Sequence, residues 1–330
     1  MKTLKQIRSS LPSHPVEVVF PDISCWQHGN TGVEYLHTID SGIAGPHAMI
    51  MGLTHGNEVS GAIAVDTLLR AGLRPPTGRI SLGFANVEAY RRFDPDDPDA
   101  SRFVDEDLNR VWSESRLDGS ADSLDLRRAR ALRPVVDTVD FLLDIHSMHE
   151  AAPPLMLSGP LDKGIRFAAE IGVPENVITD VGHANGTRLR DYGGFGDPAS
   201  PKNALLIETG QHFAMKSKDV ALDIACRFLL KVNQTAAAAA NLETFLSHPT
   251  PQAQRVLQVT HAMVADSMEF AFTQDVNGLK MIARGGTVIA RDGDREFVTP
   301  YDNCIVVMPS VRQLRPGRTV MRFAHVRPGP

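Results

Sequence analysis

The sequence predicts an α/β fold: a mixed, mostly parallel sheet flanked by helices, followed by a smaller part built of strands alone. Three observations support this prediction. Short runs that are apolar on both faces recur along the chain, as expected for strands covered on both sides. Segments with one apolar stripe at helical spacing lie between these runs. Beyond residue 250 the pattern changes to short strands separated by turns rich in glycine, aspartate and proline. Strands that alternate with helices favour a layered α/β architecture.

The elements follow in chain order. Two alternating stretches, Val16–Phe20 and Val33–Ile39, flank a glycine-containing turn and predict an N-terminal hairpin within residues 15–40. Central strands are then predicted at Ala48–Leu53, Ile80–Ala85, Phe141–Ile145 and Ala204–Ile207. Helices are predicted at Val59–Ala71, Leu124–Val136, Ile165–Ile171 and Val220–Val232.

A segment with two prolines, Ser247–Pro251, is typical of a linker and divides the chain into two predicted domains. The first spans residues 1–246 and includes the hairpin. The second spans residues 247–330 and is a small β-rich domain. Its strands are predicted at Gln254–Val264, Met281–Ala283, Thr287–Ala290, Cys304–Met308 and Val320–Phe323.

Composition excludes several classes of protein. With 42% hydrophobic and 22% charged residues, the chain is expected to be globular rather than disordered or fibrous. A formal charge of −5 without basic runs argues against a nucleic-acid partner, and no apolar stretch reaches the roughly 18 residues of a membrane span. The first residues lack the apolar core of a secretory signal, and three widely spaced cysteines fit reduced thiols. We therefore expect a cytoplasmic protein in which any metal site is built from histidines and carboxylates.

The first informative motif is His55-Gly56-Asn57-Glu58, which lies between a predicted strand and the next helix. Sites in open α/β sheets gather at the carboxyl ends of strands, and a His and a Glu three residues apart at such a junction can face one cation. Alone, this motif fits a polar turn with a helix-starting Glu at least as well.

The second motif ends another buried strand, at Asp144-Ile145-His146. Two residues apart, Asp144 and His146 share a face of the strand, and neither belongs in an apolar strand without a partner. A catalytic zinc commonly takes two His and one Glu, and Asp144 could orient a ligand histidine through its ring N–H. His149 competes with His146 as ligand, but it lies beyond the predicted strand end; a hydrogen-bonded Asp–His pair in the core is the alternative.

Two further motifs carry charged residues. Glu208 ends the apolar strand Ala204–Ile207 and is a candidate base for metal-assisted hydrolysis, with a surface Glu as the alternative. The segment Arg102–Arg110 holds two arginines, an Asn and three acids. Arginine suits carboxylates and developing oxyanions, although by itself this segment fits a solvated loop equally well.

Together these motifs resemble the succinylglutamate desuccinylase/aspartoacylase family, a branch of the zinc carboxypeptidase-like fold. The resemblance is close over residues 45–235 and loose over the β-rich end. The matching segments, in the order of the family, are His55–Glu58, Asp107–Arg110, Asp144–His146 and Ile207–Gly210.

The resemblance implies roles for the residues that match. It implies one zinc ion per chain, with His55, Glu58 and His146 as its ligands. It implies that Glu208 is the general base and that Arg102 polarises the scissile carbonyl.

Residues that bind substrate are implied in the same way. Asn109 and Arg110 match the pair that binds the substrate carboxylate. Arg188 resembles a further carboxylate-binding arginine of the family. The stretch before the strand that carries Glu208 is longer here than in the family, so Arg190 is the alternative for this role. Tyr301 resembles a substrate-contacting tyrosine of the second domain.

The function expected from this resemblance is zinc-dependent hydrolysis of a linear amide bond in amino acid metabolism. A small N-acyl amino acid, of N-succinyl or N-acetyl type, is its substrate, and a carboxylic acid and a free amino acid are its products. The β-rich domain is expected to cover the active site. A zinc carboxypeptidase acting on peptides stays open, as does a non-catalytic small-molecule binding protein, although a pure binder needs no Glu208. A homodimer is an expectation by analogy alone.

Overall fold

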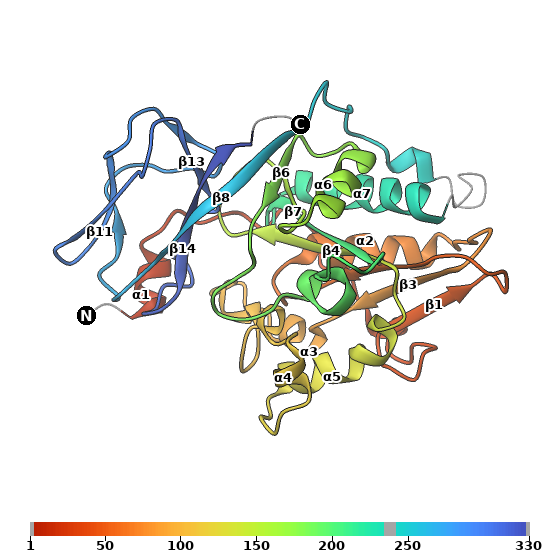
Figure 1. The fold of residues 1–330 in the computed structure, drawn as a ribbon. Coiled ribbons are helices and arrows are strands. Elements are labelled where there is room, and N and C mark those ends of the chain that lie inside the picture. Colours follow the sequence, from red (N-terminus) through yellow and green to blue (C-terminus); the bar gives the residue numbers. More distant parts are fainter. Residues whose placement is uncertain (1–2, 234–241, 328–330) are drawn as a thin grey trace.

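The computed structural model describes residues 3–233 and 242–327, and in this part of the chain an eleven-stranded sheet is flanked by helices (Figure 1). The strand order is β1-β3-β2-β4-β7-β5-β6-β8-β14-β13-β10. The helices are α1 (Leu4–Ser9), α2 (Val59–Arg70), α3 (Val87–Arg91), α4 (Glu114–Leu117), α5 (Leu124–Val136), α6 (Asp162–Ile171) and α7 (Met215–Asn233).

The strands of the first part are β1 (Leu36–Asp40), β2 (His47–Gly52), β3 (Arg79–Phe84), β4 (Phe141–Met148), β5 (Leu155–Leu157), β6 (Asn176–Thr179) and β7 (Asn203–Gln211). Those of the second part are β8 (Arg255–Val264), β9 (Ala271–Phe272), β10 (Met281–Ile282), β11 (Val288–Asp292), β12 (Arg295–Val298), β13 (Cys304–Val307) and β14 (Thr319–Val326). The predicted fold class, a mostly parallel sheet with flanking helices and a β-rich C-terminal part, is confirmed.

The centre of the sheet is parallel and buried on both faces. Strands β3, β2, β4 and β7 run parallel to one another. Alternate residues of β2 enter two cores: Ile50 packs in the core under α2, α6 and α7, and Met49 in the core under α4 and α5. This double cover explains why the runs are apolar at every position. The carboxyl ends of these strands meet at one edge of the sheet.

The β-rich part continues the same sheet. Strand β8 pairs in parallel with β6 through its first residues and antiparallel with β14 along most of its length. A separate three-stranded sheet, β12-β11-β9, completes this part. The N-terminal helix α1 lies against this β-rich part, where Ile7 shares an apolar cluster with Phe270 and with Phe323 of β14 (Figure 1).

The predicted N-terminal hairpin is wrong. Val16–Phe20 forms no strand, and β1 pairs antiparallel with β3 instead. Val18 packs against Val59 and Phe213, and the Glu17 amide donates to the Phe213 carbonyl oxygen at 3.0 Å. This segment therefore buries its apolar side chains against α2 and the loop after β7.

None of the helices in the described ranges combines the length and apolar character needed to cross a lipid bilayer.

Candidate metal centre and active site

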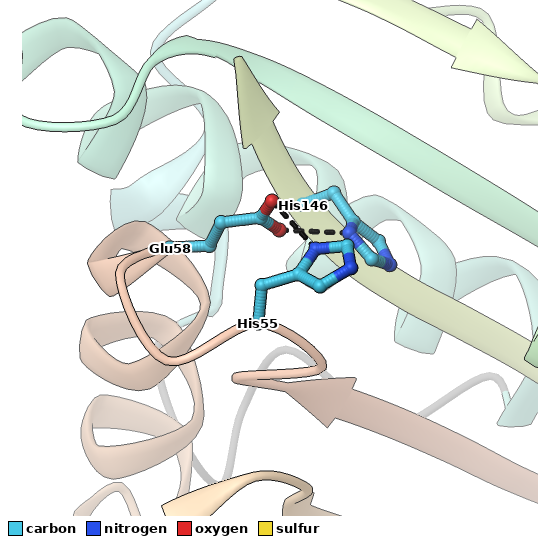
Figure 2. Close-up of side chains that lie close together, drawn as sticks. All are labelled: His55, Glu58 and His146. Atoms are coloured by element: carbon cyan, nitrogen blue, oxygen red, sulfur yellow. Dashed lines mark hydrogen bonds and ion pairs between the residues drawn. The ribbon is translucent and has the colours of Figure 1, made fainter. Parts of the chain in front are cut away.

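Three side chains with metal-binding atoms meet at the carboxyl ends of β2 and β4 (Figure 2). His55 lies in the turn after β2, Glu58 is the N-cap of α2, and His146 lies on β4. The Nδ1 atom of each histidine is 2.7 Å from a Glu58 oxygen, Oε1 for His55 and Oε2 for His146. All three side chains are buried. We call this group the Glu58 cluster; it unites the three residues that the sequence predicts as zinc ligands.

The outer nitrogens of both rings face carboxylates. His55 Nε2 lies 2.9 Å from Asp107 Oδ1, and His146 Nε2 lies 2.8 Å from Asp144 Oδ2. A neutral ring that donates its Nε2 hydrogen keeps a lone pair on Nδ1, and both Nδ1 atoms face oxygens of Glu58. Such lone pairs repel at 2.7 Å unless a hydrogen or a cation lies between them. Two imidazoles and one carboxylate are a common donor set of catalytic zinc, so these residues fit that ion.

The two supporting carboxylates are themselves held in place. Asp144 Oδ1 accepts a hydrogen bond from Thr54 Oγ1 at 2.7 Å, in keeping with the orienting role expected of Asp144. Asp107 accepts from the Asn109 amide at 3.0 Å and from Arg318 Nη2 at 3.1 Å. Burial by itself would raise the pKa of Asp107, but Arg110 and His55 hold it well below its ordinary value. Asp107 therefore supports His55 as a charged carboxylate, a role that sequence reasoning missed.

Electrostatics within the Glu58 cluster favour a carboxylate between positive charges. Burial alone would raise the pKa of Glu58, yet His55 and His146 lower it well below its usual range. Burial would likewise lower the pKa of His146, but Asp144 and Glu58 raise it well above the ordinary value. A divalent cation bound here would supply positive charge that this carboxylate-rich environment stabilises.

Arg102 is fixed beside the Glu58 cluster by a close backbone approach. The Gly56 amide donates to the Arg102 carbonyl oxygen at 3.0 Å. A Cβ on Gly56 would lie 2.4–2.5 Å from backbone atoms of Ala89, Ser101 and Tyr90, so only glycine allows this contact. The Arg102 guanidinium donates to Glu58 Oε1 at 3.1 Å and also lies close to His55, with Nη2 2.9 Å from its Nε2. It is thus positioned where an oxyanion beside the cluster could be stabilised.

Glu208 lies on β7 directly opposite His146 of β4 in the strand register. Its side chain is 6% exposed, and within the described part of the chain its Oε2 atom has no hydrogen-bond partner. Burial, reinforced by the nearby Glu58 charge, raises the pKa of Glu208 to about 8. In its ionised form, a carboxylate at this position can take a proton from water and return it.

A pocket opens from the Glu58 cluster, and both parts of the chain line it. The first part contributes the cluster, Glu208 and the loops that carry Arg102 and Arg110, while Gly278, Met308 and Gln313 come from the second part. Five arginines line this pocket: Arg102, Arg110, Arg188, Arg318 and Arg322. Sequence reasoning missed Arg318 and Arg322. The signal for Arg322 was a lone charge inside the apolar run of β14.

Asn109 and Arg110 lie at this pocket as expected. Asn109 Oδ1 accepts from the Leu189 amide at 2.9 Å, which fixes its side-chain amide. Arg110 Nη1 donates to the Asn109 carbonyl oxygen at 2.6 Å, and among the described residues no carboxylate oxygen forms a salt bridge with Arg110 or Arg322. Burial and the charge of Arg318 lower the pKa of Arg110 to about 9, against the opposing effect of Asp107. An anionic ligand would relieve this crowding of positive charge.

Comparison with known proteins agrees with this geometry. Residues 44–198 match the succinylglutamate desuccinylase/aspartoacylase catalytic domain. This match spans a little under half of the chain and includes the segments that carry His55, Glu58 and His146.

Individual proteins extend the comparison. The N-acyl-aromatic-L-amino acid amidohydrolase (carboxylate-forming) of Xenopus laevis is 30% identical over 132 residues. That match covers 37% of this chain and 40% of the relative, so it spans about two fifths of the curated protein. Among solved structures, the succinylglutamate desuccinylase of Chromobacterium violaceum is 14% identical with a TM-score of 0.64, covering 90% of each chain. Murine aminoacylase 3 is 15% identical with a TM-score of 0.60, covering 86% of this chain and 96% of its own. These structures share the fold.

Of the remaining residues predicted from the desuccinylase/aspartoacylase resemblance, Arg188 lines the pocket, whereas Arg190 and Tyr301 do not. Arg188 lines the pocket, but its guanidinium is engaged by Asp180 at 2.6 and 2.9 Å and by Asp191 at 2.5 Å. Arg190 does not line the pocket and donates to backbone carbonyl oxygens and to Asp191. Of the two rivals, Arg188 lines the pocket and Arg190 does not.

Tyr301 is not brought to this pocket. Its hydroxyl lies 2.7 Å from Thr260 Oγ1 on β8, and its ring lies beside those of His261 and His325. The β-rich part contributes arginines to the pocket rather than this tyrosine.

His149, the predicted competitor of His146, lies outside the Glu58 cluster. Its Nδ1 atom is 2.9 Å from Asp99 Oδ1 and 3.1 Å from His212 Nε2. Asp99 and His212 were not singled out in the sequence, because they lie far apart in the chain and no spacing connects them.

Proposed function

We propose that this protein is a zinc-dependent amidohydrolase that removes the acyl group from a small N-acyl amino acid. The observation that supports this proposal most directly is the Glu58 cluster with Glu208 beside it in one arginine-lined pocket. The ligands His55, Glu58 and His146 would hold one zinc ion. When bound, zinc supplies Lewis acidity that activates water and polarises an acyl oxygen.

The protein's own residues perform the proton transfers. Glu208 takes the proton from the attacking water, because its Oε2 atom is free of other hydrogen bonds among the described residues. Arg102 stabilises the negative charge that develops on the acyl oxygen, since its guanidinium lies beside the ligands and is only 11% exposed. Glu208 then passes the proton to the departing amine. The amide C–N bond breaks, and a carboxylic acid and a free amino acid result.

The arginines of the pocket favour a substrate that carries carboxylates. Arg110 and Arg322 face the pocket without a carboxylate partner among the described residues, whereas Arg188 and Arg318 are partly neutralised by Asp180 and Asp107. A carboxylate pairs well with an unpaired guanidinium in such a site. We therefore infer N-acylated acidic amino acids, or amino acids with a dicarboxylic acyl group, as the substrate class.

Enclosure limits the size of the substrate. Gly278, Met308, Ser310 and Gln313 of the β-rich part line the pocket together with the Glu58 cluster. A small polar substrate gains affinity from enclosure and paired charges rather than from apolar area. Extended peptides should be excluded, which weighs against a carboxypeptidase.

A substrate panel tests this proposal. Purified protein is treated with chelator and assayed, with and without added zinc, on N-acetyl and N-succinyl derivatives of aspartate, glutamate and phenylalanine. C-terminally matched peptides of four or more residues are assayed in parallel. We expect zinc-dependent release of the amino acid, with the highest specificity constants on the acidic derivatives.

Other outcomes would redirect the proposal. Preference for the phenylalanine derivatives would align this chain with its Xenopus laevis relative and remove the proposed role of the arginines. Comparable specificity constants for peptides would favour a carboxypeptidase. Tight substrate binding without turnover at any zinc concentration would favour a binding protein.

A further inference from the structure

A second group of metal-binding side chains lies next to the active-site pocket. Asp99 precedes the 3-10 turn Ala100–Arg102, His149 follows β4 and His212 follows β7. One donor atom of each lies within 4.8 Å of the others. We propose that these three residues, the Asp99 cluster, bind a second divalent metal ion of the zinc type. This proposal does not depend on the function of the Glu58 cluster.

Hydrogen bonds alone leave the Asp99 cluster incompletely satisfied. His149 Nδ1 has one position for a hydrogen, but it faces Asp99 Oδ1 at 2.9 Å and His212 Nε2 at 3.1 Å. If Nδ1 donates to Asp99, His212 Nε2 must share the same hydrogen. If Nδ1 carries no hydrogen, its lone pair points at a lone pair of Asp99 Oδ1, and the two atoms repel each other. A single cation accepts a lone pair from all three atoms at once.

The donor types and separations suit zinc. Two imidazole nitrogens and a carboxylate oxygen are ligands that zinc accepts, and bonds of about 2.1 Å at tetrahedral angles place ligand atoms roughly 3.4 Å apart. The observed 2.9 and 3.1 Å need widen by only about half an ångström or less to reach that spacing. The second nitrogen of His212, Nδ1, lies 2.7 Å from Ser147 Oγ, which orients the ring toward the cluster.

The surrounding charge also favours a cation. Arg312 Nη1 lies 3.4 Å from Asp99 Oδ2 and opposes a second positive charge. However, the Nε atom of the same guanidinium donates to Glu150 Oε1 at 2.7 Å. Two carboxylates therefore face one arginine, and the two histidines can both be neutral ligands.

The position of the Asp99 cluster suggests what the ion does. His149 lines the active-site pocket, and Asp99 and His149 also line a second pocket beside Arg312, which gives an ion a path from solvent. Asp99 lies three residues before Arg102 in the chain. An ion here would join the Arg102 loop to the ends of β4 and β7, and so act as a positioning element for Arg102.

Metal content of matched variants tests the second site. Tag-free full-length protein is equilibrated with buffered zinc, dialysed and analysed for zinc per chain, and its folding is checked by thermal unfolding. We expect two zinc ions in the wild type, one in His146→Ala, one in His212→Ala and none in the double variant. His261→Gln, which removes an exposed histidine outside both clusters, should keep two.

The outcomes separate the two sites. Two zinc ions in folded His212→Ala, or one in the wild type with none in His146→Ala, would overturn the proposal. One zinc in the wild type that survives in His146→Ala but is lost in His212→Ala would support the Asp99 cluster and refute the Glu58 cluster instead. If His212→Ala does not fold, Asp99→Asn keeps the side-chain shape, and retention of both ions in that variant would overturn the proposal equally.

Discussion

Replacing Glu208 with glutamine tests the proposed base with little structural disturbance. Glutamine has nearly the same shape, and the Oε2 atom has no hydrogen bond to lose within the described residues. A general base contributes about 10²–10⁴-fold to the rate. At 1.36 kcal/mol per factor of ten, this loss corresponds to about 3–5 kcal/mol of transition-state stabilisation. Since Glu208 is not among the proposed ligands, the zinc content and the Michaelis constant should stay close to those of the wild type.

Steady-state kinetics on the best substrate of the panel, together with zinc analysis, measure this effect. Glu269→Gln, an exposed substitution of the same kind, serves as the matched control and should leave the turnover number unchanged. A folded, zinc-loaded Glu208→Gln variant with near-normal turnover would refute the role of Glu208 as the base.

Three further expectations concern the same site. Arg110→Ala should chiefly raise the Michaelis constant, because the substrate carboxylate that it binds is charged throughout the reaction. Arg102→Ala should chiefly lower the turnover number, because the oxyanion develops only in the transition state. A change in the Michaelis constant alone in both variants would contradict the oxyanion role of Arg102. Gly56→Ala should lower both the melting temperature and the turnover number, since its Cβ would lie 2.4–2.5 Å from backbone atoms, and a wild-type melting temperature would argue against this close contact. In chelator-treated protein, the unfolded chain releases the Glu208 proton near its ordinary pKa of 4.5, whereas the folded chain releases it near 8, so the free energy of unfolding should fall as the pH rises from 4.5 to 8. Thermal unfolding of Glu208→Gln should lack this pH-dependent loss of stability, and identical pH profiles of the two proteins would contradict the raised pKa.

Much of the fold could be predicted because the central strands are covered on both faces. In β2, neighbouring residues Met49 and Ile50 enter different cores, so the run is apolar at every position and stands out in the sequence. Strands β5 and β6 escaped prediction because they have only three and four residues. Such short strands form through pairing with their neighbours rather than through a pattern of their own.

The failed hairpin shows another limit of pattern reading. Alternation along Val16–Phe20 reports that one face is covered, but not by what. The cover for Val18 is Val59 and Phe213, which lie far away in the sequence. Likewise, the continuity of the β-rich part with the main sheet rests on the pairing of β6 with β8, which no local pattern reveals.

The candidate site divides in the same way. His55, His146 and Glu208 could be found because each is a polar residue at or just beyond the end of an apolar strand, and Glu58 because it follows His55 by three residues at the start of the next helix. A lone charge in the apolar run of β14 marks Arg322 as unusual, but the position of Arg318 and Arg322 at the pocket could not be predicted, because it depends on where the last strand, β14, is placed. Their partners, or lack of partners, appear only in the folded chain.

Anomalous diffraction at the zinc absorption edge, from crystals of zinc-loaded protein, tests the central proposal most directly. We expect a strong peak between His55 Nδ1, His146 Nδ1 and the Glu58 carboxylate, and the loss of that peak together with amidohydrolase activity in His146→Ala. A fully active crystalline protein with no anomalous peak at the Glu58 cluster would contradict it.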